Sequence, residues 1–341
     1  MRIRDAFAGG CFLNLRKPKG LTSHDCVDKV RKIIKNRQIG HCGTLDPFAE
    51  GVLPLAVGRA TRFIQYLNND KEYEGSIRFG VTTSSDDIDG DILTKRPASW
   101  LSRETIAKTM QTFVGEIQQV PPRVSAIKIN GQRAYDLARR NVDVQLQARQ
   151  VEIYQIQLLK FRSGDFPEAL INVKCGAGTY IRSIARECGE AIFHPKTRET
   201  IDLVNFEDEG DQIVGGTLAT LLRKRSSNFD LKRSITLEAL EADWKLNSCN
   251  VAAVHSIENA LEHLHSVQLP STLSAMYLKN QIVNFPITLI KDTGVVTVHA
   301  PSKTGRALRI YDSAKPAQLL GVSPIEMTSS GNVCLRKRLF L

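Results

Sequence analysis

Segments with two different apolar spacings alternate along the first two thirds of the chain, and this alternation constrains the fold most strongly. Apolar residues at every second position are typical of half-buried strands, and apolar residues three and four apart are typical of helices. The strand-like segments are 12–15, 71–81, 151–161 and 169–176, and the helix-like segments are 102–115, from Ser102 to Gly115, and 179–190. Mixed strands and helices in one stretch predict an α+β domain.

The segment 12–37 is expected to form a strand, a turn and a helix. Thr22 and Asp25 have the spacing of a capping box, which marks the first turn of a helix. The apolar positions that follow recur at helical spacing, and the remaining surface of this helix is basic: Lys29, Arg31, Lys32, Lys35 and Arg37. Such a face suits contacts with phosphates, although solvation alone also explains it.

The charge balance indicates a polyanionic partner. Lys and Arg number 46 against 36 acids, a formal net charge of +10, and excess positive charge attracts nucleic acid. We expect no membrane association, because no apolar run approaches the roughly 20 residues that a bilayer crossing needs. The first residues lack the apolar core of a secretory signal, so a cytoplasmic location is expected.

Cysteine and histidine usage predicts neither disulfides nor a bound metal. The seven cysteines are odd in number and form no C-x-x-C pair, which favours reduced thiols. The seven histidines show no ligand spacing. A faint calcium-loop pattern in SSDDIDGD, residues 84–91, fails because Ala98 stands where a bidentate Glu is required. We therefore interpret 84–91 as an acidic surface turn.

Composition changes divide the chain into further regions. Residues 123–150 are rich in arginine and begin after Pro-Pro, which predicts a protruding basic loop. Residues 191–214, with the acidic run FEDEGD, are interpreted as a surface insertion. The helical signal ends near residue 268, and strand-like runs such as ALRIYD follow. We expect one domain over 1–268 and a small, mostly β domain over 269–341.

Asp46, in the stretch HCGTLDPFAEGVLP (41–54), is a candidate for chemistry, although an Asp before Pro more often forms a turn. A carboxylate that acts without a metal in a water-poor pocket needs a nearby cation to remain ionised. Arg182 is the candidate cation, because a guanidinium binds a carboxylate with two parallel contacts. Tyr73 offers an aromatic face for a flat substrate and a hydroxyl for proton transfer.

Five blocks of the sequence resemble, in the same order, the signature blocks of the TruB-family tRNA pseudouridine synthases, and they cover most of residues 11–190. The blocks are LRKPKGLTSHDCVDKVRK, GHCGTLDPFAEGVLPLAVGRATRFIQYL, KEYEGSIRFG, VPPRVSAIKINGQRAYDLAR and CGAGTYIRSIARECG. The resemblance implies the pseudouridine synthase fold, a mixed β-sheet flanked by helices, with a C-terminal PUA-like RNA-binding domain. It also implies that the protein isomerises the uridine at position 55, in the T-loop of tRNA, to pseudouridine.

The resemblance further implies roles for single residues. Asp46 corresponds to the catalytic carboxylate, with Tyr73 and Arg182 completing the catalytic set. It implies that His41 handles the flipped-out nucleotides and that 123–150 is the RNA-gripping thumb. The implied substrate contacts are His41, Leu45, Lys17, Lys128, Arg133, Tyr180 and Ile181, with Arg223 and Arg225 as further RNA contacts. No cofactor, metal or obligate protein partner is implied, and a monomer is expected.

Two other functions fit the same basic surfaces. A tRNA-binding RNA chaperone would carry similar RNA-binding regions, but it would not need Asp46, Tyr73 and Arg182 together. A pseudouridine synthase acting on another RNA, such as ribosomal RNA under a guide RNA, would keep the catalytic set. The prominent thumb-like block favours direct recognition of the tRNA T-arm.

Overall fold

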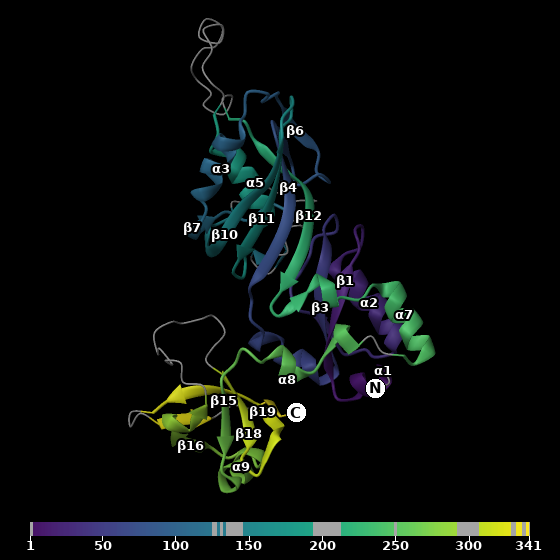
Figure 1. Ribbon diagram of the computed structural model, residues 1–341, viewed down its shortest axis with the longest axis vertical. Helices are drawn as coiled ribbons and strands as arrows, with labels where there is room; N and C mark the ends of the chain where they lie inside the picture. Colours follow the sequence, from purple (N-terminus) through teal and green to yellow (C-terminus); the bar gives the residue numbers. More distant parts are fainter. Residues whose placement is uncertain are drawn as a thin grey trace, which may run out of the picture.

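The structure is a computed structural model, and it describes residues 3–124, 128–129, 132–133, 146–193, 213–248, 251–291, 307–328, 332–335 and 339–340. Within these residues, two large sheets and the helices packed against them make up the fold (Figure 1). The α+β class predicted from the sequence is confirmed. Among these residues, no helix combines the length and the apolar character needed to span a membrane.

The larger sheet is mixed. Its order is β14 (Val254–His255), β1 (Cys11–Lys17), β3 (Glu50–Val57), β12 (Gly216–Ser226), β4 (Lys71–Phe79), β11 (Glu168–Cys175), β10 (Arg149–Arg162) and β7 (Gly115–Gln119). Strands β12 and β3 pair in parallel, whereas β12 and β4 pair antiparallel. Two short strands join its edges, β2 (Ile39–His41) beside β3 and β13 (Phe229–Asp230) beside β12.

Strand β3 is buried along nearly its whole length because both faces of this part of the sheet are covered. Leu53 and Leu55 pack in one cluster with helices α1 (Ile3–Ala8), α2 (Ser23–Ile34) and α7 (Leu237–Leu246). Val52 and Ala56 pack in another cluster with the 3-10 helix η1 (Gly58–Tyr66). The predicted capping box of α2 is confirmed, since Thr22 and Asp25 bond reciprocally.

Helices α3 (Arg103–Gln111) and α5 (Ile181–Glu190) lie beside β4, β10 and β11 (Figure 1). Ser102 caps α3 as predicted, but the predicted end is wrong: Gly115, with a φ of 107°, instead opens β7. Helix α5 approaches β12 so closely that a Cβ on Gly216 would collide with the carbonyl oxygen of Ala185. This close packing holds the first turn of α5, which carries Arg182, over the middle of the sheet.

The second sheet contains most of the C-terminal residues. Its order is β16 (Val283–Pro286), β20 (Asn332–Leu335), β19 (Lys315–Met327), β18 (Ala307–Asp312), β15 (Ser266–Leu269) and β17 (Ile290–Lys291), with β21 (Leu339–Phe340) beside β19 and helix α9 (Ser271–Leu278) packed against it. The expected domain boundary after residue 268 falls within β15. Ala307 and Val322 of this sheet share a core cluster with Phe12 of the larger sheet, so the two units are packed together.

The shorter elements connect these parts. They are β5 (Val81–Thr83) paired with β6 (Ile92–Lys95), β8 (Lys128–Ile129) paired with β9 (Gln132–Arg133), α8 (Ile257–Ala260), and the 3-10 turns η3 (Leu231–Arg233), η4 (Val251–Ala253) and η5 (Ile287–Leu289).

Candidate active site

The loop that carries Asp46 spans residues 42–49, between β2 and β3, and its backbone is anchored on both sides of Asp46. The buried hydroxyl of Ser23 accepts from the Leu45 N–H at 2.8 Å and donates to the Leu45 carbonyl at 3.0 Å. The Nζ of Lys17 donates to the Pro47 carbonyl at 3.2 Å. The carboxylate of Asp46 is therefore presented from a fixed backbone.

Lys17 does not lie where the expected substrate contact requires. Its side chain is fully buried, and its ammonium donates to the carbonyls of Pro18 and Pro47. Burial lowers the pKa of this ammonium to about 8. The structure corrects the prediction: Lys17 holds the Asp46 loop from inside the protein and has no surface to offer to RNA.

Arg182 and Asp46 form the ion pair that the sequence indicated. Nη2 donates to Oδ1 at 3.1 Å, and Nε lies 3.0 Å from Oδ2, although its N–H is not aligned for a hydrogen bond. The Arg182 side chain is only 4% exposed, whereas that of Asp46 is 30% exposed. A buried, permanently charged guanidinium thus stands behind a carboxylate that solvent or a substrate can reach.

Asp87 binds the same guanidinium from the other side, so the interpretation of 84–91 as a surface turn is correct for the exposed residues 84, 88, 89 and 91 but wrong for Asp87. Asp87 is 5% exposed, and its Oδ2 lies 3.3 Å from Nη1 of Arg182. The Ser85 hydroxyl donates to Asp87 at 2.6 Å, and the Ser85 carbonyl accepts from Arg182 at 3.0 Å. Burial raises the pKa of Asp87, and the bond from Ser85 and the charge of Arg182 oppose this shift.

Tyr73 lies on β4 in the same core cluster as Leu45 and Ile181. All three side chains are buried, with 8% of Tyr73 exposed. Burial raises the pKa of the Tyr73 phenol, and the charge of Arg223 partly offsets the shift. The phenol is therefore neutral at pH 7, which suits stacking and hydrogen bonding better than proton removal by a phenolate.

His41 and Tyr180 lie half-buried at the ends of the elements that carry the site. Burial, followed by the charge of Arg223, lowers the pKa of His41, so its imidazole is neutral at pH 7. The Tyr180 N–H donates to Oε1 of Gln119 at 2.8 Å, and Nε2 of Gln119 donates to the Tyr180 carbonyl at 3.2 Å. This reciprocal pair fixes the start of α5 against β7.

Lys128 and Arg133 are opposite one another in the backbone register of the short β8–β9 pair. Their side chains, and most of the predicted thumb at 123–150, lie outside what the structure describes. The same holds for most of the predicted insertion at 191–214. Its two ends meet in a bridge between Phe193 and Ile213, beside the end of α5.

Arg223 is not the surface RNA contact that the sequence suggested. It is 1% exposed, and its guanidinium donates to the carbonyls of Val52, Thr44 and Gly43 at 2.7, 3.0 and 3.1 Å. Arg225 is half-buried, and its Nε lies 3.8 Å from the Glu72 carboxylate. Sequence reasoning missed the burial of Arg223 because a basic run normally indicates a solvated face.

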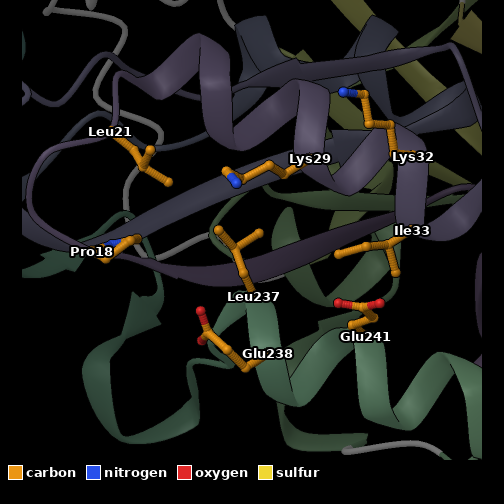
Figure 2. A pocket seen from close by; sticks show the side chains of 8 residues that line it. All are labelled: Pro18, Leu21, Lys29, Lys32, Ile33, Leu237, Glu238 and Glu241. Atoms are coloured by element: carbon orange, nitrogen blue, oxygen red, sulfur yellow. The ribbon is translucent and has the colours of Figure 1, made fainter.

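A groove between α2 and α7 lies apart from these residues, and it brings part of the basic face of α2 to the same groove as two acids of α7 (Figure 2). Lys29 and Lys32 of α2 line it together with Glu238 and Glu241 of α7. Arg31 of the same helix pairs with Asp28 at 2.9 Å. Lys29 and Lys32 remain exposed, and Glu241 also pairs with Lys245 of its own helix at 2.8 Å.

Within the described ranges, no three His, Cys, Asp or Glu side chains gather as metal ligands would. No disulfide joins any of the six described cysteines.

Solved structures with the same fold come from protein and RNA–protein complexes. A chain in a crystal structure of a Cbf5-Nop10-Gar1 complex has a TM-score of 0.66 and 27% identity, covering 97% of this chain and 85% of that one. A chain in the structure of an H/ACA RNP bound to a substrate RNA containing 2'-deoxyuridine has a TM-score of 0.65 and 25% identity. The match covers 99% of this chain and 86% of that one.

Sequence relatives identify the family. The model of the TruB family pseudouridylate synthase N-terminal domain matches residues 31–181. A tRNA pseudouridine synthase B of Trichormus variabilis is 42% identical over 279 residues, which cover 82% of this chain and 87% of that protein. A protein of the same name from Synechocystis sp. is 40% identical over 335 residues, which cover 97% of this chain and 99% of that protein. The chain belongs to the TruB family of pseudouridylate synthases.

Proposed function

We propose that this protein isomerises the uridine at position 55 in the T-loop of tRNA to pseudouridine, with Asp46 as the catalytic carboxylate. The relatives named tRNA pseudouridine synthase B support the reaction and the substrate class. The observation that carries the site assignment is the partly exposed Asp46 carboxylate, bound by two nitrogens of the buried Arg182. Glu50 and Glu74 also lie in signature blocks and have similar exposure, but their ion-pair partners, Arg16 and Lys224, are exposed by 47% and 38%, whereas Arg182 is buried.

The reaction requires one ionised carboxylate and no redox change. The bond from N1 of uracil to C1′ of the ribose breaks, the base turns over, and C5 bonds to C1′. N1 gains a proton and C5 loses one, so atoms balance. Asp46 either attacks covalently or removes the ribose 2′ proton to give a glycal, and both routes need the charge that Arg182 stabilises.

The residues around Asp46 would shape the pocket for a base that has left its stack. Flipping the uridine out costs a few kcal/mol. Tyr73 would stack on the uracil, and the apolar side chains of Leu45 and Ile181 would limit water. His41, with a neutral imidazole, would fill the space that the base vacates, and Tyr180 would contact the substrate at the start of α5.

Contacts with phosphates would offset the cost of flipping. We assign them to the thumb at 123–150, including Lys128 and Arg133, and to the C-terminal domain beginning near residue 269. The net charge of +10 supports this assignment. We further propose that the protein acts as a monomer in the cytoplasm on the T-arm of tRNA.

The test is to incubate the purified protein with an unmodified tRNA transcript and to map pseudouridine by carbodiimide-dependent primer-extension stops. A transcript with cytidine at position 55 serves as the matched control. We expect a stop at the T-loop uridine of the first transcript only. Tight binding without a stop would favour the RNA chaperone, and a stop in ribosomal RNA alone would favour another RNA substrate.

A further inference from the structure

Arg223 stands out because it is a buried cation that donates to three main-chain carbonyls and also bonds the Tyr73 phenol. It is the largest of the fully buried side chains among the described residues, and its described contacts include no ion pair with a carboxylate. Burying a guanidinium carries a desolvation cost that its contacts must offset. Its hydrogen bonds therefore show which part of the structure it stabilises.

Those hydrogen bonds converge on the Asp46 loop. Nη2 and Nη1 bind the carbonyls of Gly43 and Thr44, and Nε binds the carbonyl of Val52, at the start of β3. The guanidinium thus ties the first residues of the loop to the strand that follows it. Because the guanidinium is planar, it fixes the direction of all three carbonyls as well as their position.

The strands approach closely where this contact forms. Gly51 pairs with Arg223 in the parallel register, and a Cβ on Gly51 would collide with the Arg223 main chain. Gly51 also has a φ of 113°, a conformation that other residues rarely adopt. The charge of Arg223 reaches the rest of the site, since it contributes to the lowered pKa of His41 and opposes the raised pKa of Tyr73.

We propose that Arg223 is a positioning residue, which holds the Gly43 and Thr44 carbonyls against Val52 and so fixes the backbone from which Asp46 reaches Arg182. The inference rests on Asp46 being the catalytic carboxylate. Arg223 acts from inside the protein, through the loop carbonyls and the Tyr73 phenol, because its side chain has no exposed surface for RNA. Ser23 and Lys17 hold the same loop directly before and after Asp46, at Leu45 and Pro47, and Arg223 adds an anchor further upstream, at Gly43 and Thr44.

The experiment compares Arg223→Ala with Lys224→Ala, a change at the next residue of β12, whose half-exposed side chain pairs with Glu74. We expect Arg223→Ala to lower the single-turnover rate at saturating enzyme by about 100-fold, as a small misplacement of a reacting group does. The Kd for tRNA should stay within about twofold, because no RNA contact is lost. Millimolar guanidinium should restore part of the single-turnover rate of Arg223→Ala. Lys224→Ala should keep the wild-type rate, and added guanidinium should not change it.

Each other outcome has a defined meaning. A folded Arg223→Ala protein with the wild-type rate, or with a loss fully explained by a raised Kd, overturns the proposal. If Arg223→Ala does not fold, Arg223→Lys decides, because it keeps the charge but lacks the planar fork; a wild-type rate in that variant overturns the proposal. Asp46→Asn is measured in parallel: if it stays active, the site assignment fails, whereas an inactive Asp46→Asn beside a fully active Arg223→Ala refutes the Arg223 inference alone.

Discussion

Two nitrogens of Arg182 face the two oxygens of Asp46, at 3.0 Å from Nε to Oδ2 and 3.1 Å from Nη2 to Oδ1. The remaining nitrogen, Nη1, faces Asp87 and the Ser85 carbonyl, and Nη2 also donates to the Val124 carbonyl. Both terminal nitrogens of this guanidinium donate hydrogen bonds, and Nε adds a charge contact with Asp46, so the guanidinium is held in one orientation. The carboxylate of Asp46 is fixed by a partner that is itself fixed.

The shape of Arg182 should matter beyond its charge. Arg182→Lys keeps the positive charge but cannot contact both Asp46 oxygens and Asp87 together. We expect the single-turnover rate to fall by about 100-fold, with the Kd for tRNA nearly unchanged. Rapid-quench measurement of pseudouridine at saturating enzyme tests this, and wild-type turnover would show that Arg182 does not orient Asp46.

Asp87 should influence the rate through Arg182, in a manner that depends on pH. Arg182 and the Ser85 hydroxyl stabilise the ionised form of Asp87, whereas burial raises its pKa, so its charge is lost, as pH falls, at a higher pH than for an ordinary aspartate. Asp87→Asn lacks this charge at every pH. We expect the single-turnover rate of Asp87→Asn to be roughly tenfold to 100-fold below that of the wild type at pH 7. The ratio of the wild-type rate to the variant rate should shrink toward acidic pH. A ratio independent of pH would contradict this account.

Buried histidines should make the fold less stable in acid. Burial lowers the pKa of His255 and His263 below 6.5, so in this range the unfolded chain binds more protons than the folded one. Their contribution to the free energy of unfolding is complete above 6.5 and falls as pH decreases below it. Urea unfolding of wild type and His255→Asn tests this. The free energy of unfolding of the wild type should exceed that of His255→Asn by less as pH falls from about 7.5 to about 5.5. The same difference in the free energy of unfolding at both pH values would contradict the prediction.

Phosphate contacts by the thumb should appear in the salt dependence of binding. Lys128→Ala should make the slope of the logarithm of the tRNA association constant against the logarithm of the salt concentration less steep by about 0.7 to 0.9. This is the value for one lost phosphate contact. Lys245→Ala is the control, because that exposed lysine of α7 pairs with Glu241. Filter binding at several salt concentrations measures both slopes. An unchanged slope for Lys128→Ala would remove Lys128 from the proposed RNA surface.

Local patterns were sufficient to predict much of the fold. The spacing of Thr22 and Asp25 predicted the start of α2, and the alternation in 71–81 predicted β4. These features depend on neighbours within a few residues, which the sequence shows directly. The end of α3 was misjudged, because a glycine after a helix can end that helix or begin the next strand, and Gly115 does the second.

The parts of the site that escaped prediction depend on contacts between distant residues. Ser85 and Arg182 are separated by 97 positions, and Val52 and Arg223 by 171. Asp87 lies in a polar, acidic stretch and Arg223 in a basic one, and both stretches have the composition of a solvated surface. Their burial becomes visible only when α5 and β12 are brought beside the loops of β3 and β5. The pairing of Asp46 with Arg182 was found from the sequence because both residues lie in family signature blocks.

The central claim is that Asp46 carries the chemistry. Asp46→Asn keeps the shape of the side chain and removes its charge, so the most direct measurement is pseudouridine formation in an unmodified tRNA transcript by this variant, with its Kd measured alongside. We predict wild-type binding and no primer-extension stop at the T-loop uridine. Conversion above a few per cent of wild type, at equal binding, would contradict the account.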